Sequence, residues 1–139
     1  MLKYVKKICV AHCRHLRFVD VVTRSSSFPL VSLRYWRPFK TLTMHGRGSL
    51  ECEFTSNNGV GVSNVTLKAD IDGFEAAFSD SVCYLVECVD GSSYLVGSFE
   101  PPHPRTSAVL TVPDAPSSPC RAEITVTLTA PHAIMQVID

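Results

Sequence analysis

Apolar and polar residues alternate strictly in three segments of the chain. In residues 50–54, leucine, cysteine and phenylalanine alternate with two glutamates. In residues 64–71 and 122–129, an aliphatic residue occupies every second position and a polar or charged residue stands between. Successive side chains of a β-strand point to opposite faces of its sheet. Each segment is therefore predicted to be a strand with one face on a core and one face in water.

Two turn signals join neighbouring β-forming runs into hairpins. Asn57-Asn58-Gly59 and Asp90-Gly91 each lie between two such runs. Glycine after Asn or Asp tolerates the positive φ that a tight turn between antiparallel strands requires. The predicted hairpins comprise residues 49–56 with 61–71, and residues 82–89 with 92–99.

The remaining elements are less regular. Residues 17–23, 30–36, 107–112 and 121–129 are predicted to be strands, and Phe74 and Phe78 are spaced as in a single helical turn. Residues 4–12 stay open between helix and strand, because Val5, Ile8 and Cys9 lie near helical spacing. The pattern predicts an all-β fold with at most one short helix, an antiparallel sandwich or small barrel of about seven to eight strands. Residues 17–139 are expected to form a single β domain, with residues 1–16 as a basic N-terminal arm or the first element.

The zero net charge of the 139 residues hides a strong asymmetry. Residues 1–47 hold ten lysines and arginines against one acid, a net charge of +9, and residues 48–139 carry −9. Such a split suits a nucleic-acid-binding arm, packing of the basic segment beside the acidic part of its own subunit, or head-to-tail contact between subunits. The candidate interaction residues are Lys3, Lys6, Lys7, Arg14, Arg17, Arg34 and Arg37.

The cysteines and histidines form no convincing reactive site. Cys9, His12, Cys13 and His15 are zinc-type ligands, yet four ligands within seven residues do not easily surround one ion. Free, mostly buried thiols are expected for all six cysteines, since the chain shows no clear export signal and is read as intracellular in origin. No Gly-x-Ser-x-Gly elbow or phosphate-binding loop is present. We therefore expect no enzyme activity, no metal, no cofactor and no membrane span.

From Gly48 onward, the order of features resembles a group of small virion proteins of Bacteroides-type phages and prophages, which lie among tail and head-to-tail genes. The resemblance covers residues 48–129. Its matching segments are Gly48-Ser49-Leu50-Glu51-Cys52-Glu53-Phe54, Val82-Cys83-Tyr84-Leu85-Val86-Glu87, Asp90-Gly91, Tyr94-Leu95-Val96-Gly97 with Glu100-Pro101, and Ile124-Thr125-Val126-Thr127-Leu128-Thr129.

This resemblance implies a non-enzymatic structural subunit of a phage tail or head–tail connector. Such a subunit would be made in the host cytoplasm and placed in the virion, as a homo-oligomeric ring or tube in contact with other virion proteins. The alternative is a nucleic-acid-binding module that uses the basic N-terminal third of the chain.

Overall fold

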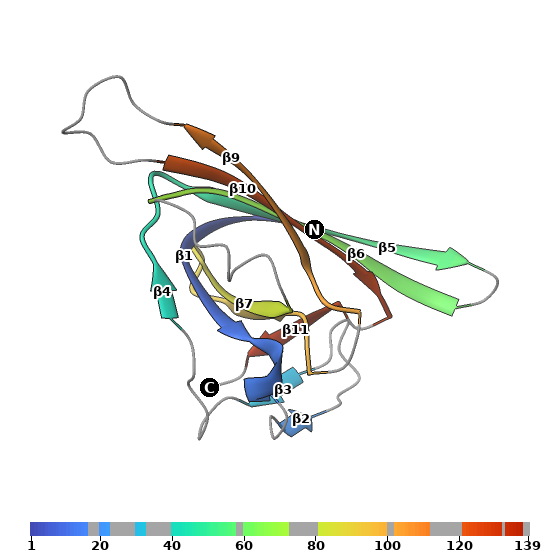
Figure 1. Ribbon diagram of the computed structural model, residues 1–139. Helices are drawn as coiled ribbons and strands as arrows, with labels where there is room; N and C mark the ends of the chain where they lie inside the picture. The colour runs from blue at the N-terminus through green and yellow to red at the C-terminus, as the bar shows by residue number, and fades with distance from the viewer. Residues whose placement is uncertain are drawn as a thin grey trace.

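The chain is described by a computed structural model as an all-β protein (Figure 1). The described residues are 1–16, 20–22, 30–32, 40–57, 60–72, 81–99, 102–111, 121–131 and 133–137. The elements are β1 (Leu2–His12), the 3-10 turn η1 (Cys13–Leu16), β2 (Asp20–Val22), β3 (Leu30–Ser32), β4 (Lys40–Leu42), β5 (Gly48–Asn57), β6 (Val60–Asp72), β7 (Val82–Cys88), β8 (Ser93–Val96), β9 (Arg105–Thr111), β10 (Arg121–Ala130) and β11 (Ile134–Val137).

The described strands form one eleven-stranded sheet in the order β2-β3-β11-β8-β7-β1-β5-β6-β10-β9, with β4 paired to β1. All pairings are antiparallel except that of β11 with β3. The all-β, sandwich-like prediction is confirmed. The sheet has more strands than the seven to eight expected, because it also includes β1, which the pattern left open, and β4 and β11, whose three and four residues carry too little pattern to read.

The sheet folds into two layers because β1 curves from one to the other (Figure 1). Its first residues, Leu2 to Val5, pair with β5, and Val5 to His12 pair with β7. We call β5, β6, β10 and β9 the alternating layer, and β7, β8, β11 and the second half of β1 the doubly buried layer. The main core lies between them, with Leu50, Leu67 and Ile124 from one layer and Ile8 and Val86 from the other.

The two predicted hairpins are confirmed as β5–β6 and β7–β8. Phe54 shares the inward side of β5 with Leu50 and Cys52, as the alternation indicates. It is nevertheless exposed, because the β5–β6 hairpin extends past the core (Figure 1). Of the predicted strands 17–23 and 30–36, only residues 20–22 and 30–32 are described, and both are strands; the predicted turn around Phe74 and Phe78 lies outside the described residues.

Residues 4–12, which the pattern left open, lie in the strand β1. The register between β1 and β7 shifts between Val5 and Lys7, so Lys6 is an extra residue of the kind found in a β-bulge. The bulge separates the inward-facing Val5 and Ile8 by three positions instead of two. This local insertion explains the helix-like spacing of Val5, Ile8 and Cys9 in the sequence.

Gly97 ends β8 at the point where the chain approaches β7. Its φ of 97° is a left-handed conformation that side-chain-bearing residues rarely adopt. A Cβ at this position would lie 2.9 Å from the Cys83 sulfur and 2.9 Å from the Pro104 ring. Glycine is therefore required here both by backbone conformation and by close packing.

Candidate interaction surface

The basic residues of β1 contact acids in the second half of the chain. Lys3 forms an ion pair with Asp90 in the β7–β8 turn, lies 3.3 Å from the Ser92 hydroxyl, and has its ammonium 5.7 Å from the centre of the Tyr94 ring. The Lys6 ammonium lies 3.3 Å from a carboxylate oxygen of Glu87 on β7. Lys3 and Lys6 therefore pair with acids of their own subunit, which is one of the three interpretations of the charge asymmetry.

The other candidate basic residues differ in their placement. Lys7 on β1 and Arg14 in η1 are exposed, and the Arg14 backbone N–H donates a hydrogen bond to Nδ1 of His12 at 3.2 Å. Arg17, Arg34 and Arg37 lie outside the described residues. Lys6, Lys7 and Arg14 are thus exposed, and of these three only Lys6 forms an ion pair with another described residue.

Asp90 fastens the β7–β8 turn to the start of β1. Its carboxylate contacts Lys3, and it accepts hydrogen bonds from the Ser92 hydroxyl at 2.5 Å and the Ser92 backbone N–H at 3.0 Å. These contacts stabilise the ionised form, so the Asp90 pKa is held well below its usual value, with the Lys3 hydrogen bond the largest cause. The lysine–aspartate pair holds two chain segments together and leaves neither group poised for chemistry.

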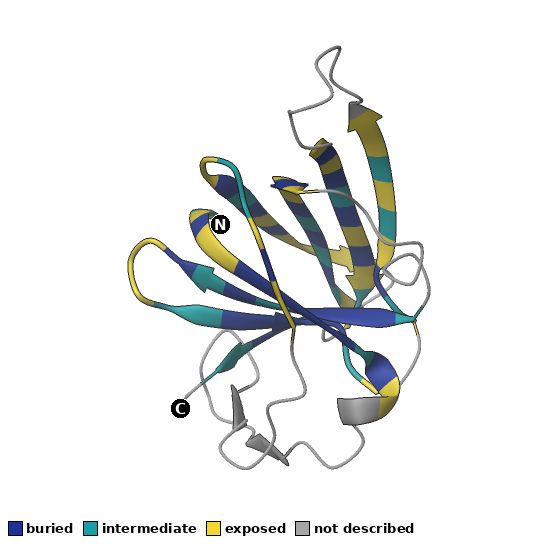
Figure 2. Cartoon of the chain, turned by 60° about the vertical axis from the view of Figure 1, so that its left-hand side comes forward, coloured by how far each residue is buried: buried dark blue, intermediate teal, exposed yellow. Residues whose placement is uncertain are grey.

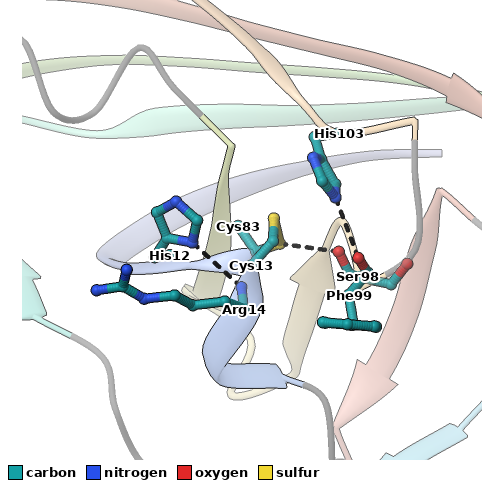
Figure 3. Close-up of a disulfide and its surroundings, with 7 residues drawn as sticks. All are labelled: His12, Cys13, Arg14, Cys83, Ser98, Phe99 and His103. Carbon is teal, nitrogen blue, oxygen red and sulfur yellow. Dashed lines mark hydrogen bonds between the residues drawn. A yellow bond between two sulfur atoms is a disulfide. The ribbon is translucent and has the colours of Figure 1, made fainter.

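The cysteines do not all remain free thiols, contrary to expectation. Cys13 in η1 and Cys83 on β7 form a disulfide with a Cα–Cα distance of 5.5 Å (Figure 3). The two cysteines meet because His12 and Val82, the residues just before them, are paired between β1 and β7. This pairing could not be inferred from the sequence, in which the cysteines are 70 residues apart. Figure 3 shows His12 and Arg14 beside the bridge; on its other side, Ser98 has its carbonyl oxygen 3.5 Å from the Cys83 sulfur.

This disulfide removes Cys13 from the cluster of zinc-type ligands at the N-terminus. No group of three or more His, Cys, Asp or Glu side chains within the described parts of the chain could hold a metal ion. Cys83 and Cys88 face opposite sides of β7, as their spacing predicts, since Cys88 belongs to the main core and Cys83 to a second cluster. Burial raises the pKa of the Cys52 and Cys88 thiols, which keeps them protonated and unreactive at neutral pH.

The outer face of the alternating layer joins the water-facing sides that the alternation predicts strand by strand into one surface, which the sequence alone did not reveal. Its side chains are exposed or half-buried, and the burial colours alternate along its strands (Figure 2). Cross-strand register sets the outward-facing residues in rows. Asn64 on β6 links two neighbouring strands in this face: its amide donates to the Thr55 hydroxyl at 3.3 Å and its carbonyl accepts from the Thr129 hydroxyl at 2.9 Å. One row across four strands comprises Arg105, Thr127, Thr66 and Glu51.

The end strand β9 carries unusual apolar exposure. Val109 is 67% exposed and Leu110 is 55% exposed, and as neighbours on a strand they point to opposite faces. The only signal in the sequence is the run Ala108-Val109-Leu110, which breaks the alternation seen elsewhere in this layer. The run predicts a strand, but only the sheet order reveals that this strand lies at an edge.

Comparison of the chain with protein-family models, with curated proteins and with solved structures gives no match. Among the described residues there is no helix with the length and hydrophobicity that a membrane crossing requires. The fold therefore defines an all-β protein with a broad mixed-charge outer face.

Proposed function

We propose that this protein is a non-enzymatic structural subunit of a phage virion, a tail or head–tail connector component that assembles through contacts between subunits. The observation that carries the proposal is the outer face of the alternating layer. It spans four strands, is lined by threonines, and presents charges of both signs. A surface of this kind offers area for a protein partner without converging groups for a reaction.

The resemblance to small virion proteins supports the same proposal. Its matching segments include residues of β5, β7, β8 and β10, which belong to both layers. A disulfide is also compatible with a virion outside its host, where oxidising conditions allow such bridges to persist.

Charge placement favours contacts of a basic surface on one subunit with an acidic surface on the next. Glu51 and Glu53 are exposed on the outer side of β5, and Lys7 and Arg14 are exposed on the β1–η1 segment. Two distinct surfaces that recognise each other produce a head-to-tail contact, which closes into a ring when the rotation per subunit divides a circle. This arrangement would yield the proposed homo-oligomer.

The test is a charge-swap experiment followed by light scattering. A K7E/R14E variant should assemble poorly alone because its basic surface becomes acidic, and an E51K/E53K variant should fail for the converse reason. An equimolar mixture should regain assembly, since each variant then complements the other. Wild-type oligomers should weaken with salt, because the Debye length falls to about 8 Å at 0.15 M.

A strict monomer from low to high salt at high protein concentration would contradict the proposal. Mass spectrometry of purified virions then asks directly whether the protein is a virion component, and the identity of neighbouring genes gives independent support.

The exposed Lys7 and Arg14 also keep the alternative of nucleic-acid binding testable. Salt-dependent affinity for single- or double-stranded DNA or RNA, lost in K7E/R14E, would favour that alternative.

A further inference from the structure

β9 stands at one end of the sheet. Within the described parts of the chain it pairs with β10 and with no other strand (Figure 1). An edge strand presents a row of backbone N–H and C=O groups that can pair with another strand. Natural edges are commonly blocked by proline, inward-pointing charges or bulges. None of these interrupts residues 106–111, whose sequence is Thr-Ser-Ala-Val-Leu-Thr.

The strand is held firmly from its inner side. The hydroxyl groups of Tyr84 on β7 and Thr106 on β9 are hydrogen-bonded at 2.6 Å, which ties the start of β9 to the buried layer beneath it. Tyr84 is fully buried, and burial raises its pKa. Ala108 packs against the main core from the same side. β9 is therefore already held in place, so pairing with another strand would cost little conformational entropy.

Val109 and Leu110 give the edge apolar side chains on both faces. Val109 is the most exposed large apolar side chain among the described residues. On β10, Val109 is paired with Glu123 and Leu110 is paired with Ala122. Both apolar side chains stay more than half exposed despite this pairing. A strand added at the edge of β9 would cover both at once, whereas a partner docking on one face would cover one.

We propose that β9 pairs with β9 of a second copy of this chain, in antiparallel register centred on Val109. A two-fold axis perpendicular to the sheet places the outer faces of both copies on the same side of the joined sheet. Two residues that oppose each other across the contact must therefore both point outward or both point inward. Centring on Val109 meets this condition. It sets Val109 against Val109, Ala108 against Leu110, and Ser107 against Thr111.

This register makes the edge self-complementary. The five paired residues, 107–111, carry no charge, and Arg105 lies outside the pairing, so no like charges oppose each other. The exposed Val109 and Leu110 of both copies are brought to the centre of the contact, where burial of apolar side chains stabilises pairing. The inference rests on the self-association of the proposed function and deepens it by adding a second contact, a two-fold one, to the head-to-tail contact described above.

The first experiment compares Val109→Lys with a matched control, Val89→Lys. Val89 is also an exposed valine, but it lies in the β7–β8 turn. Sedimentation equilibrium at high salt should show a concentration-dependent dimer for the wild type and V89K. V109K removes the apolar contact at the centre of the pair and sets two lysines there, so we expect a roughly tenfold or larger rise in the dissociation constant even at high salt, which corresponds to about 1.4 kcal/mol. Far-UV circular dichroism establishes that each variant is folded, and Leu110→Lys serves as the second edge variant.

A second experiment tests the register through disulfide formation. Directly opposed residues of antiparallel strands have Cα atoms about 4.5 to 5.5 Å apart, within the range of a disulfide. Val109→Cys should therefore form a covalent dimer under mild oxidation. Ser107→Cys should not, because the two copies of residue 107 would be offset by four residues, roughly 13 Å along the strands. The wild type sets the background from the native cysteines.

The outcomes separate this inference from the proposed function. Oligomers that V109K leaves intact, together with no cross-link in V109C, would overturn the β9 contact and leave the virion proposal standing. A salt-resistant dimer abolished by V109K supports the β9 contact even if the charge-swap variants change nothing. Capture of β9 by a different virion protein, with no self-association of this chain, would also overturn the inference. A strict monomer under all conditions would overturn both.

Discussion

The two layers of this protein bury their strands in different ways. In β10 of the alternating layer, buried Ala122, Ile124, Val126 and Leu128 alternate with polar residues that face outward. In β7 of the doubly buried layer, Val82, Cys83 and Tyr84 are consecutive and all buried. A strand with one wet face shows its period in the sequence, whereas a strand covered on both faces reads as a continuous apolar run.

The difference arises from what lies on the far side of each layer. The far side of β7 and β8 holds a second apolar cluster of Cys13, Cys83, Leu95 and Met135, packed with Leu85 and Val137. The outer face of the alternating layer is exposed or half-buried instead. The position of a strand in the sheet therefore decides whether the side chains on one face or on both of its faces are buried and contribute to stability.

The largest expected effect is on the doubly buried layer, through its disulfide. Replacing both Cys13 and Cys83 by alanine removes a cross-link between residues 70 apart. Without the closed loop, the unfolded chain has more conformational entropy, and we expect the free energy of unfolding to fall by about 4 kcal/mol. Chemical denaturation measures the loss. A reductant should destabilise the wild type and leave the double variant unchanged; an equal effect on both would contradict the prediction.

Alanine substitutions at adjacent positions should distinguish the two layers directly. Tyr94 and Leu95 on β8 are both buried, so Y94A and L95A should each cost about 3 kcal/mol. On β10, Leu128→Ala should cost a similar amount, while its exposed neighbour Thr127→Ala should stay within about 0.5 kcal/mol of the wild type. Urea denaturation of the four variants gives the free energies. A large loss in T127A, or none in Y94A, would erase the contrast between the layers.

The smallest expected effect concerns acid stability at the edge of the doubly buried layer. Because the Asp90 pKa is lower in the folded protein than in the unfolded chain, its contribution to stability is full above about pH 4. That contribution declines as pH falls below the unfolded value and Asp90 takes up a proton. Asp90→Asn should therefore flatten the fall of the melting temperature between neutral and acid pH. The control is the same substitution in a Lys3→Met background, where its effect should be smaller, because the hydrogen bond from Lys3 is the largest cause of the lowered Asp90 pKa.

The sequence was most informative where one face of a strand meets water. Alternation in residues 64–71 and 122–129, together with Asp90-Gly91, was enough to predict β6, β10 and the β7–β8 hairpin. Lys6 defeated the same reasoning in β1, because a single inserted residue changes the spacing of buried positions from two to three. Strands such as β4 and β11 were missed because three or four residues do not display a period.

The candidate site was harder to predict than the strands. Lys3 and Lys6 could be recognised as basic residues, but not as partners of Asp90 and Glu87, since these acids lie more than 80 positions away in the chain. The Cys13–Cys83 bridge escaped prediction for the same reason.

By itself, the order of apolar and polar residues determined that this protein is built of strands and which side of its amphipathic strands faces the core. Side-chain alternation is a local property of the extended backbone, so it can be read without knowing the neighbours of a strand. The tertiary structure alone decided which cysteines meet, which lysines are paired, and that β9 lies at an edge. These features depend on register between distant segments, which is set when the whole sheet buries its apolar faces together.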